Sequence, residues 1–248
     1  MKAMILAAGL GTRLKPLTDD RPKALVEIDG RTLLEIALTR LRGFGIREVI
    51  INLHHFADKV VDYLKAKDNF GIRIEISKED VLLDTGGGLK KAAWFFLENP
   101  QNDEPFVLHN VDVLSGIDIA AMAQFHKKFK ALATLAVQER VTSRYLLFDG
   151  DSKLCGRRFG SDETAEIVRP SRHVKALAFS GIHVLSPRLL SKLTEEGPFS
   201  IITSYLRMAT NGERIMAFRC DKDYWRDLGK PDDLKKAERD FAQGMIRQ

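Results

Sequence analysis

The chain opens with Met4-Ile5-Leu6-Ala7-Ala8-Gly9-Leu10-Gly11-Thr12-Arg13-Leu14-Lys15-Pro16-Leu17-Thr18, an apolar run that ends in small residues. Glycines let backbone N–H groups approach an anion closely, and successive N–H groups form an anion-binding concavity. Arg13 and Lys23 then bracket a segment whose prolines restrict its conformation. We therefore predict a buried strand that leads into a polyphosphate-binding loop.

Apolar runs of strand length alternate with helical patterns in the first half of the chain. Glu48–Leu53 and Pro105–Asn110 are continuous apolar runs, typical of parallel strands buried on both faces. Thr32 and Glu35 form a capping box ahead of helical spacing up to Gly43. The alternation predicts an α/β fold with a mostly parallel central sheet and helices on both faces.

Three chemically distinctive segments follow predicted strands. They are the opening loop, the stretch Asp84–Gly88, and Asp112, which comes just after Pro105–Asn110. We predict that Asp84–Gly88 is a glycine-rich turn and that the helix after it reaches Glu98. Ligands of parallel sheets bind beyond the carboxyl ends of the strands. One cleft can therefore hold all three segments.

The pattern changes after Glu139. We predict a hairpin of residues 144–148 and 153–159, and a long strand over residues 175–185. Two helices are predicted over residues 187–194 and 201–210, and a terminal helix is predicted to begin at Pro231. No internal repeat or linker separates the two halves. We expect a single domain over 1–248, in which residues 139–248 add a small β extension to the half formed by residues 1–138.

Composition limits the classes of function. The 248 residues carry a formal charge of +5, and 44% are hydrophobic, which is ordinary for a globular protein. No basic stripe interleaved with aromatic residues favours nucleic acid binding. Cys155 and Cys220 lack metal-ligand spacing, and no apolar run is long enough to cross a membrane. We expect a reduced, cytoplasmic protein without a leader segment or membrane contact.

Three kinds of phosphate chemistry could use the opening loop. A P-loop needs two glycines around four residues followed by Lys-Ser/Thr, and a dinucleotide fingerprint needs a third glycine where this chain has Leu14. The third kind, nucleotidyl transfer, needs cations on a triphosphate and carboxylates that hold Mg²⁺. Asp112 and Asp227 each end an apolar strand-like run. An Asp at a strand end is also a common turn residue, so both interpretations of these two positions stay open.

Four motifs resemble those of the sugar-1-phosphate nucleotidylyltransferase family, and together they span nearly the whole chain. They are Gly9–Thr18 with Arg21–Leu25, Asn110–Leu114, Phe179–Val184 and Trp225–Pro231. The resemblance implies a Rossmann-like nucleotidyltransferase fold. Asn52–His55 and Thr142–Asp149 are most similar to small single-domain members that act on N-acetylmuramate 1-phosphate or heptose 1-phosphate.

The resemblance also implies roles for individual positions. Arg13 would stabilise the leaving pyrophosphate, and Lys23 would neutralise the α-phosphate. Asp112 and Asp227 would hold Mg²⁺. The nucleotide would be bound by Ala7, Ala8, Gly9, Gly11, Thr12, Thr85, Gly86 and Gly87. Glu166 and Arg169 would contact the sugar phosphate and Gly181 would let the sugar approach its strand, so that residues 139–248 would form the sugar-binding half. Apart from the resemblance, Asn52 is a candidate sugar ligand, because it ends a predicted strand and sugar hydroxyls need fixed amide partners.

The reaction implied is Mg²⁺-dependent transfer of a nucleoside monophosphate from an NTP to a sugar 1-phosphate, most closely from UTP to N-acetylmuramate 1-phosphate. Guanylyl or cytidylyl transfer to heptose or another sugar 1-phosphate is the alternative. A catalytically silent regulator that binds a nucleotide sugar is an alternative of another class. Two positions depart from the family pattern, because Val111 replaces the usual Gly and Arg169 replaces a frequent Lys. Both a monomer and a homodimer are compatible with the sequence.

Overall fold

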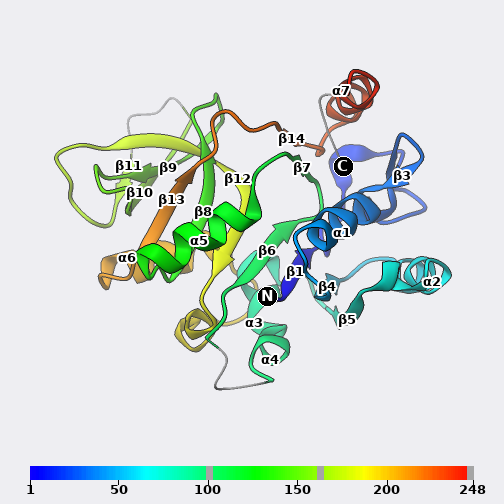
Figure 1. Cartoon of the computed structure of the whole chain (residues 1–248), viewed down its shortest axis with the longest axis horizontal. Coiled ribbons are helices and arrows are strands. Elements are labelled where there is room, and N and C mark those ends of the chain that lie inside the picture. The colour runs from blue at the N-terminus through cyan, green and yellow to red at the C-terminus, as the bar shows by residue number, and fades with distance from the viewer. Residues whose placement is uncertain (99–102, 161–164, 245–248) are drawn as a thin grey trace.

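A computed structural model describes residues 1–98, 103–160 and 165–244 and shows a twisted central sheet between helices (Figure 1). The order of strands along the sheet is β11-β10-β9-β12-β6-β1-β4-β5, and β8 pairs with both β12 and β13. The strands are β1 (Ala3–Leu6), β4 (Glu48–Leu53), β5 (Arg73–Lys78), β6 (Phe106–Asn110), β8 (Ala133–Gln138), β9 (Arg144–Phe148), β10 (Leu154–Phe159), β11 (Ala165–Ile167), β12 (Lys175–Leu185) and β13 (Ile215–Arg219).

The N-terminal half of the sheet is parallel. Strand β1 pairs with β4 and β6, and β4 pairs with β5, all in parallel register. Strand β12 then joins β6, β8 and β9 in antiparallel pairs, so the hairpin β9–β10 and the short β11 extend the sheet beyond its parallel part. The predicted α/β fold class, with its mostly parallel centre and small β extension, is confirmed.

Helices cover both faces of the sheet, as predicted. They are α1 (Leu33–Gly43), α2 (Ala57–Ala66), α3 (Asp84–Lys91), α4 (Ala93–Phe96), α5 (Ile119–Phe129), α6 (Ile201–Thr210) and α7 (Pro231–Ala242), with short 3₁₀ turns η1 (Thr12–Leu14), η2 (Lys23–Leu25), η3 (Asp68–Gly71) and η4 (Pro187–Lys192). Alternate residues of a strand face opposite sides. Ile5 accordingly lies in the core that contains α1 and α2, whereas Met4 lies in the core that contains α3, α4 and α6.

The capping box predicted for α1 is half formed. The Thr32 hydroxyl accepts a hydrogen bond from the backbone N–H of Glu35 at 3.0 Å. The Glu35 carboxylate instead accepts a hydrogen bond from the Tyr63 hydroxyl at 2.7 Å. The side chain that could have completed the box therefore ties the start of α1 to α2.

The predicted glycine-rich turn at Asp84–Gly88 was wrong, and so was the continuous helix to Glu98. These residues form the first turns of α3, and the helical path is interrupted at Ala92 before α4. A Cβ on Gly86 would lie 2.2 Å from the Phe199 ring, and one on Gly87 would lie 2.8 Å from the Gly197 carbonyl oxygen. The glycines let α3 pack directly against the segment that precedes α6.

A second, two-stranded sheet of β7 (Val113–Ser115) and β14 (Trp225–Asp227) lies beside the main one. Asp227 is the register partner of Val113, and the N–H of Leu228 donates to the Asp112 carbonyl at 2.8 Å. Terminal helix α7 begins at Pro231, as predicted. This antiparallel pair places the two aspartates of the sequence motifs next to each other.

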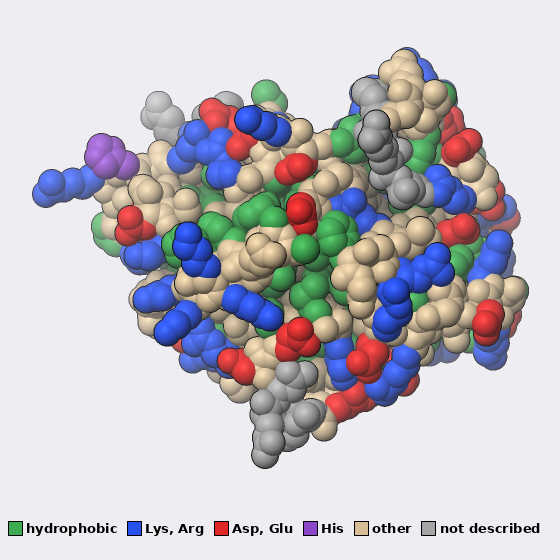
Figure 2. All heavy atoms as spheres, in the orientation of Figure 1, with side chains coloured by type: hydrophobic (Ala, Val, Ile, Leu, Met, Phe, Trp, Pro, Cys, Tyr) green, Lys and Arg blue, Asp and Glu red, His purple; other side chains and the backbone are tan. Residues whose placement is uncertain are grey.

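Lys, Arg, Asp and Glu side chains are interspersed over the face drawn in Figure 2, and hydrophobic side chains gather near its centre. Within the ranges that the structure describes, no helix has the length and apolar character needed to cross a bilayer.

Two buried histidines are expected to make the folded chain less stable in mild acid. Burial lowers the pKa of His126 to about 4 and that of His183 to about 3. An unfolded histidine takes up a proton near pH 6.5, so below that pH the unfolded state binds more protons and the free energy of unfolding falls. We expect each of the two histidines to lower the free energy of unfolding by about 2 kcal/mol between pH 7 and pH 5. Urea denaturation at the two pH values measures this change.

The exposed His173 provides the control for this prediction. The variant His173→Asn should show the same fall in unfolding free energy as the parent chain, because that fall is attributed to the buried histidines, which this substitution leaves in place. A free energy of unfolding that is equal at pH 5 and pH 7 would contradict the interpretation.

Candidate active site

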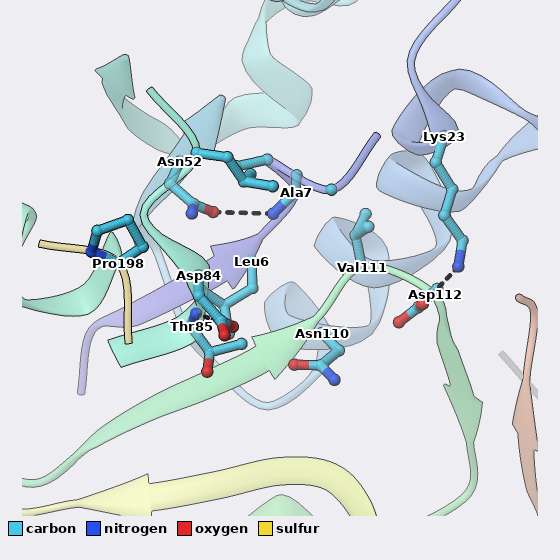
Figure 3. A pocket seen from close by; sticks show the side chains of 13 residues that line it. Leu6, Ala7, Lys23, Asn52, Asp84, Thr85, Asn110, Val111, Asp112 and Pro198 are labelled. Atoms are coloured by element: carbon cyan, nitrogen blue, oxygen red, sulfur yellow. Dashed lines mark hydrogen bonds and ion pairs between the residues drawn. The ribbon is translucent and has the colours of Figure 1, made fainter. Parts of the chain in front are cut away.

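A cavity of about 370 Å³ opens at the carboxyl ends of β1, β4 and β6 (Figure 3). Its lining residues are Leu6, Ala7, Ala8, Gly9, Lys23, Asn52, Leu82, Asp84, Thr85, Asn110, Val111, Asp112 and Pro198. The opening loop, the start of α3 and Asp112 therefore meet in one cleft, as the order of strands and loops predicted.

The opening loop folds back on itself after Ala7, Ala8 and Gly9, which line the cavity. Gly11 has φ +67°, and a Cβ there would lie 3.0 Å from the Thr18 methyl group and 3.2 Å from Lys23 Cβ. The Thr18 hydroxyl donates to the Gly11 carbonyl at 2.9 Å. A Cβ on Gly9 would meet no described atom within 4 Å, so the backbone at Gly9 faces open space. Gly11 and Thr12 shape the loop from outside the cavity lining.

The two cations of the opening segment meet the two aspartates. Lys23 is buried and forms an ion pair with Asp112, as Figure 3 shows. Arg13 and Asp227 converge on Gly229, where a Cβ would lie 2.7 Å from Arg13 Nη2 and 2.5 Å from Asp227 Oδ1. The N–H of Gly229 donates to the same Asp227 oxygen at 2.7 Å. Four charged side chains from distant parts of the chain thus share one site.

The carboxyl group of Asp227 has an environment suited to a cation. Burial raises its pKa, and the neighbouring Asp112 raises it further, while Lys23 and Arg13 act in the opposite direction. Two carboxylates that disfavour each other's ionisation are stabilised when a divalent cation lies between them. No group of three His, Cys, Asp or Glu forms a metal site in the described parts of the chain. Two carboxylates nevertheless fit Mg²⁺, which usually takes its other ligands from waters and substrate phosphates.

The start of α3 forms another wall of the cavity. Asp84 and Thr85 line it, and the Thr85 hydroxyl accepts a hydrogen bond from the N–H of Ile201 at 3.0 Å. Gly86 and Gly87 lie outside the lining, and their N–H groups donate to the Phe199 carbonyl at 2.9 and 3.4 Å. These two N–H groups already donate to Phe199, which differs from the nucleotide-binding role that the resemblance implied for Gly86 and Gly87.

The four residues assigned to the sugar lie in different places. Asn52 lines the cavity. Gly181 has φ +73° in β12, and a Cβ there would lie 2.7 Å from Val113 and 3.0 Å from Asn110. Glu166 forms an ion pair with Arg157, and Arg169 forms one with Asp149. Glu166 and Arg169 belong to the β extension and do not line the cavity.

Sequence reasoning missed two buried or half-buried charged residues near the site. Glu79 directly follows β5 and is 2% exposed. Its position at the carboxyl end of a parallel strand was the signal that could have revealed it. The Arg140 guanidinium stacks 3.5 Å from the centre of the Trp225 ring and donates to the Phe179 carbonyl. No sequence pattern pointed to this stack.

Comparisons with known proteins match the whole chain. The family model described as Nucleotidyl transferase matches residues 2–244. The N-acetylmuramate alpha-1-phosphate uridylyltransferase of Caulobacter vibrioides is 32% identical, over 97% of each chain. The mannose-1-phosphate guanyltransferase of Yarrowia lipolytica is 30% identical over 94% of this chain, which spans 62% of that longer protein. Among solved structures, the crystal structure of HddC from Yersinia pseudotuberculosis complexed with GMP-PN superposes on this chain with a TM-score of 0.74 and 24% sequence identity. The match covers 97% of this chain and 99% of that one, and this likeness shows the fold.

Proposed function

Because this chain belongs to the nucleotidyl transferase family, we propose that it transfers a nucleoside monophosphate from an NTP to a sugar 1-phosphate and releases pyrophosphate. The observation that carries the proposal is the convergence of Arg13 and Lys23 with Asp112 and Asp227. Lys23 and Asp112 line the cavity, and Arg13 and Asp227 lie next to them outside its lining. Such a reaction needs positioned charge more than covalent chemistry from the protein. A silent regulator would have no need to keep all four charged groups.

Each of the four side chains has a role in the proposed reaction. Lys23 neutralises the α-phosphate while an oxygen of the sugar 1-phosphate attacks in line, and Arg13 stabilises the departing pyrophosphate. Asp112 and Asp227 would hold Mg²⁺, which when bound neutralises charge on the phosphates. The open backbone at Gly9, together with Ala7 and Ala8, leaves room for the nucleotide.

The proposed substrates are UTP and N-acetylmuramate 1-phosphate. The similarity to the Caulobacter vibrioides uridylyltransferase over 97% of each chain supports this choice. The Yarrowia lipolytica guanyltransferase supports guanylyl transfer as the second candidate. Val111 lines the cavity, is 6% exposed and donates its N–H to the Leu6 carbonyl at 3.1 Å. Its side chain thus narrows the cavity without interrupting the backbone pairing that precedes Asp112.

A substrate screen tests the proposal directly. Each of the common ribonucleoside triphosphates is incubated with Mg²⁺ and a panel of sugar 1-phosphates, and pyrophosphate release is measured. We expect UTP with N-acetylmuramate 1-phosphate to give a kcat/KM at least about tenfold above the other pairs, a difference that pocket contacts commonly produce.

Other outcomes of the screen would assign different substrates or a different activity to the chain. Faster turnover with GTP or CTP, or with a heptose 1-phosphate, would replace the proposed substrates within the same reaction class. Nucleotide binding without pyrophosphate release from any pair would refute the proposed activity and favour the regulatory alternative.

A further inference from the structure

A chain of three hydrogen bonds runs behind the cavity through Asn52 and Glu79. The N–H of Ala7 donates to Asn52 Oδ1 at 2.8 Å, a bond visible in Figure 3. Asn52 Nδ2 donates to Glu79 Oε1 at 2.7 Å, and the N–H of Leu83 donates to Glu79 Oε2 at 3.0 Å. Both side chains are 2% exposed. Asn52 and Glu79 are called the amide–carboxylate clamp below.

The clamp joins segments that form different walls of the cavity. Ala7 follows β1, Asn52 lies on β4 and Glu79 follows β5, so the clamp crosses the carboxyl ends of three neighbouring strands. Leu83 immediately precedes α3, whose first residues Asp84 and Thr85 line the cavity. The position of the opening loop is therefore tied to the position of α3.

The direction of each hydrogen bond in the clamp is fixed. A backbone N–H can only donate, so the Asn52 oxygen must face Ala7, and its NH₂ group must then face the carboxylate. A Cβ on Gly88 would lie 2.7 Å from Asn52 Nδ2 and 2.8 Å from Glu79 Oε1, so α3 packs directly on the clamp. The Asn52 oxygen and NH₂ group are thus both held by the protein, and only 2% of the residue is exposed, which leaves little of it for a sugar hydroxyl.

We propose that Asn52 and Glu79 are positioning residues, which hold the opening loop and α3 at the spacing that the nucleotide requires and do not contact the sugar themselves. A buried hydrogen-bonded network of this kind rigidifies its surroundings when every member is satisfied. Preorganised walls lower the cost of ordering the site on binding. This inference rests on the proposed function for its kinetic readout, and it replaces the sugar contact that the strand-end position of Asn52 predicted.

A reversal of polarity tests the clamp. In the variant Asn52→Asp, a second carboxylate faces Glu79, and neither carboxylate can donate a hydrogen bond. In the variant Glu79→Gln, the amide has only one oxygen in place of the two that accept from Asn52 and Leu83. In the double variant, the carboxylate introduced at position 52 accepts from Ala7 and from the amide introduced at position 79. The oxygen of that new amide accepts from Leu83. Three hydrogen bonds are thereby restored with similar side-chain shapes, and the donor and acceptor of the middle bond are exchanged.

The expected result is a rescue in the double variant. Each single substitution should raise KM for UTP, assayed with Mg²⁺ and N-acetylmuramate 1-phosphate, by about tenfold or more with a smaller change in kcat. The double variant should return KM to within about threefold of the parent value, a coupling that double-mutant cycles detect. The exposed pair Asn211→Asp with Glu238→Gln makes the same chemical changes and should leave KM unaltered.

Two outcomes would overturn the inference. Single variants that lose stability but keep the parent KM would show that the clamp is only structural. A double variant that regains KM for UTP but not for N-acetylmuramate 1-phosphate would show that the Asn52 amide contacts the sugar. If the single variants do not fold, the folded double variant still allows both KM values to be compared.

Hydrogen exchange separates this inference from the proposed function. The Ala7 amide of the parent chain should exchange slowly without any ligand, and should exchange faster in either single variant than in the double variant. Rapid exchange of Ala7 in the parent chain would refute the clamp. Slow exchange in a chain that turns over no NTP would refute only the proposed function.

Discussion

Replacing Asp112 with Asn is expected to lower kcat for pyrophosphate release by about 10³-fold, the range found when one electrostatic contact to the transition state is lost. The substitution keeps the shape of the side chain but removes its charge. Of the two proposed Mg²⁺ ligands Asp227 alone would then remain, and Lys23 would lose its ion pair with position 112. The measurement is the steady-state rate at saturating substrates, repeated over a range of Mg²⁺ concentrations.

Asp151 provides a matched control, because it lies exposed in the turn between β9 and β10. The variant Asp151→Asn should keep the parent rate, and both variants should unfold near the parent urea concentration. A rate for Asp112→Asn within about tenfold of the parent value would mean that the catalytic cation is held elsewhere.

The second large effect is expected at Gly86, where Ala should lower the free energy of unfolding by about 3 kcal/mol, the upper part of the range for overpacked cores. The added Cβ would lie 2.2 Å from Phe199 Cε2 and 2.9 Å from the Phe199 carbonyl oxygen. The N–H of Gly86 donates to that same carbonyl, so the two backbones cannot separate without losing the bond. Urea denaturation measures the change.

Gly43 at the end of α1 is the control for this substitution. A Cβ there meets no described atom within 4 Å, so Gly43→Ala should be neutral or should stabilise the chain by up to about 1 kcal/mol. Adding Phe199→Leu to Gly86→Ala should recover part of the loss, because the ring contact is relieved while the backbone contact remains. Equal effects of the two Gly→Ala substitutions would contradict the packing interpretation.

Local sequence patterns predicted most elements of the fold. Strand β4 and helix α6 have the predicted limits, because their hydrophobic periodicity and flanking residues are local signals. The glycines of α3 were misinterpreted for the opposite reason. Glycine locally favours a turn, but Gly86 and Gly87 are required by Phe199 and Gly197, which lie far along the sequence. Only the tertiary structure brings them together.

The site residues that belong to sequence motifs could be predicted. The site residues whose positions depend on tertiary packing could not. Arg13 and Lys23 with their two aspartates belong to dense motifs, and the structure brings them together. The strand end marks Glu79 as a candidate, but its burial depends on how closely α3 approaches, which no local pattern encodes. The ion pairs of Glu166 and Arg169 likewise depend on strand pairing within the β extension.

The pairing of β7 with β14 also has a consequence for protein synthesis. Asp112 leaves the ribosome early, but the strand that carries Asp227 is made much later, after β8 to β13. The parallel sheet and the opening loop can form while the nascent chain still lacks its second aspartate. The site therefore becomes complete only after β14 has been translated, and a nascent chain that ends before β14 lacks Asp227 for the proposed reaction.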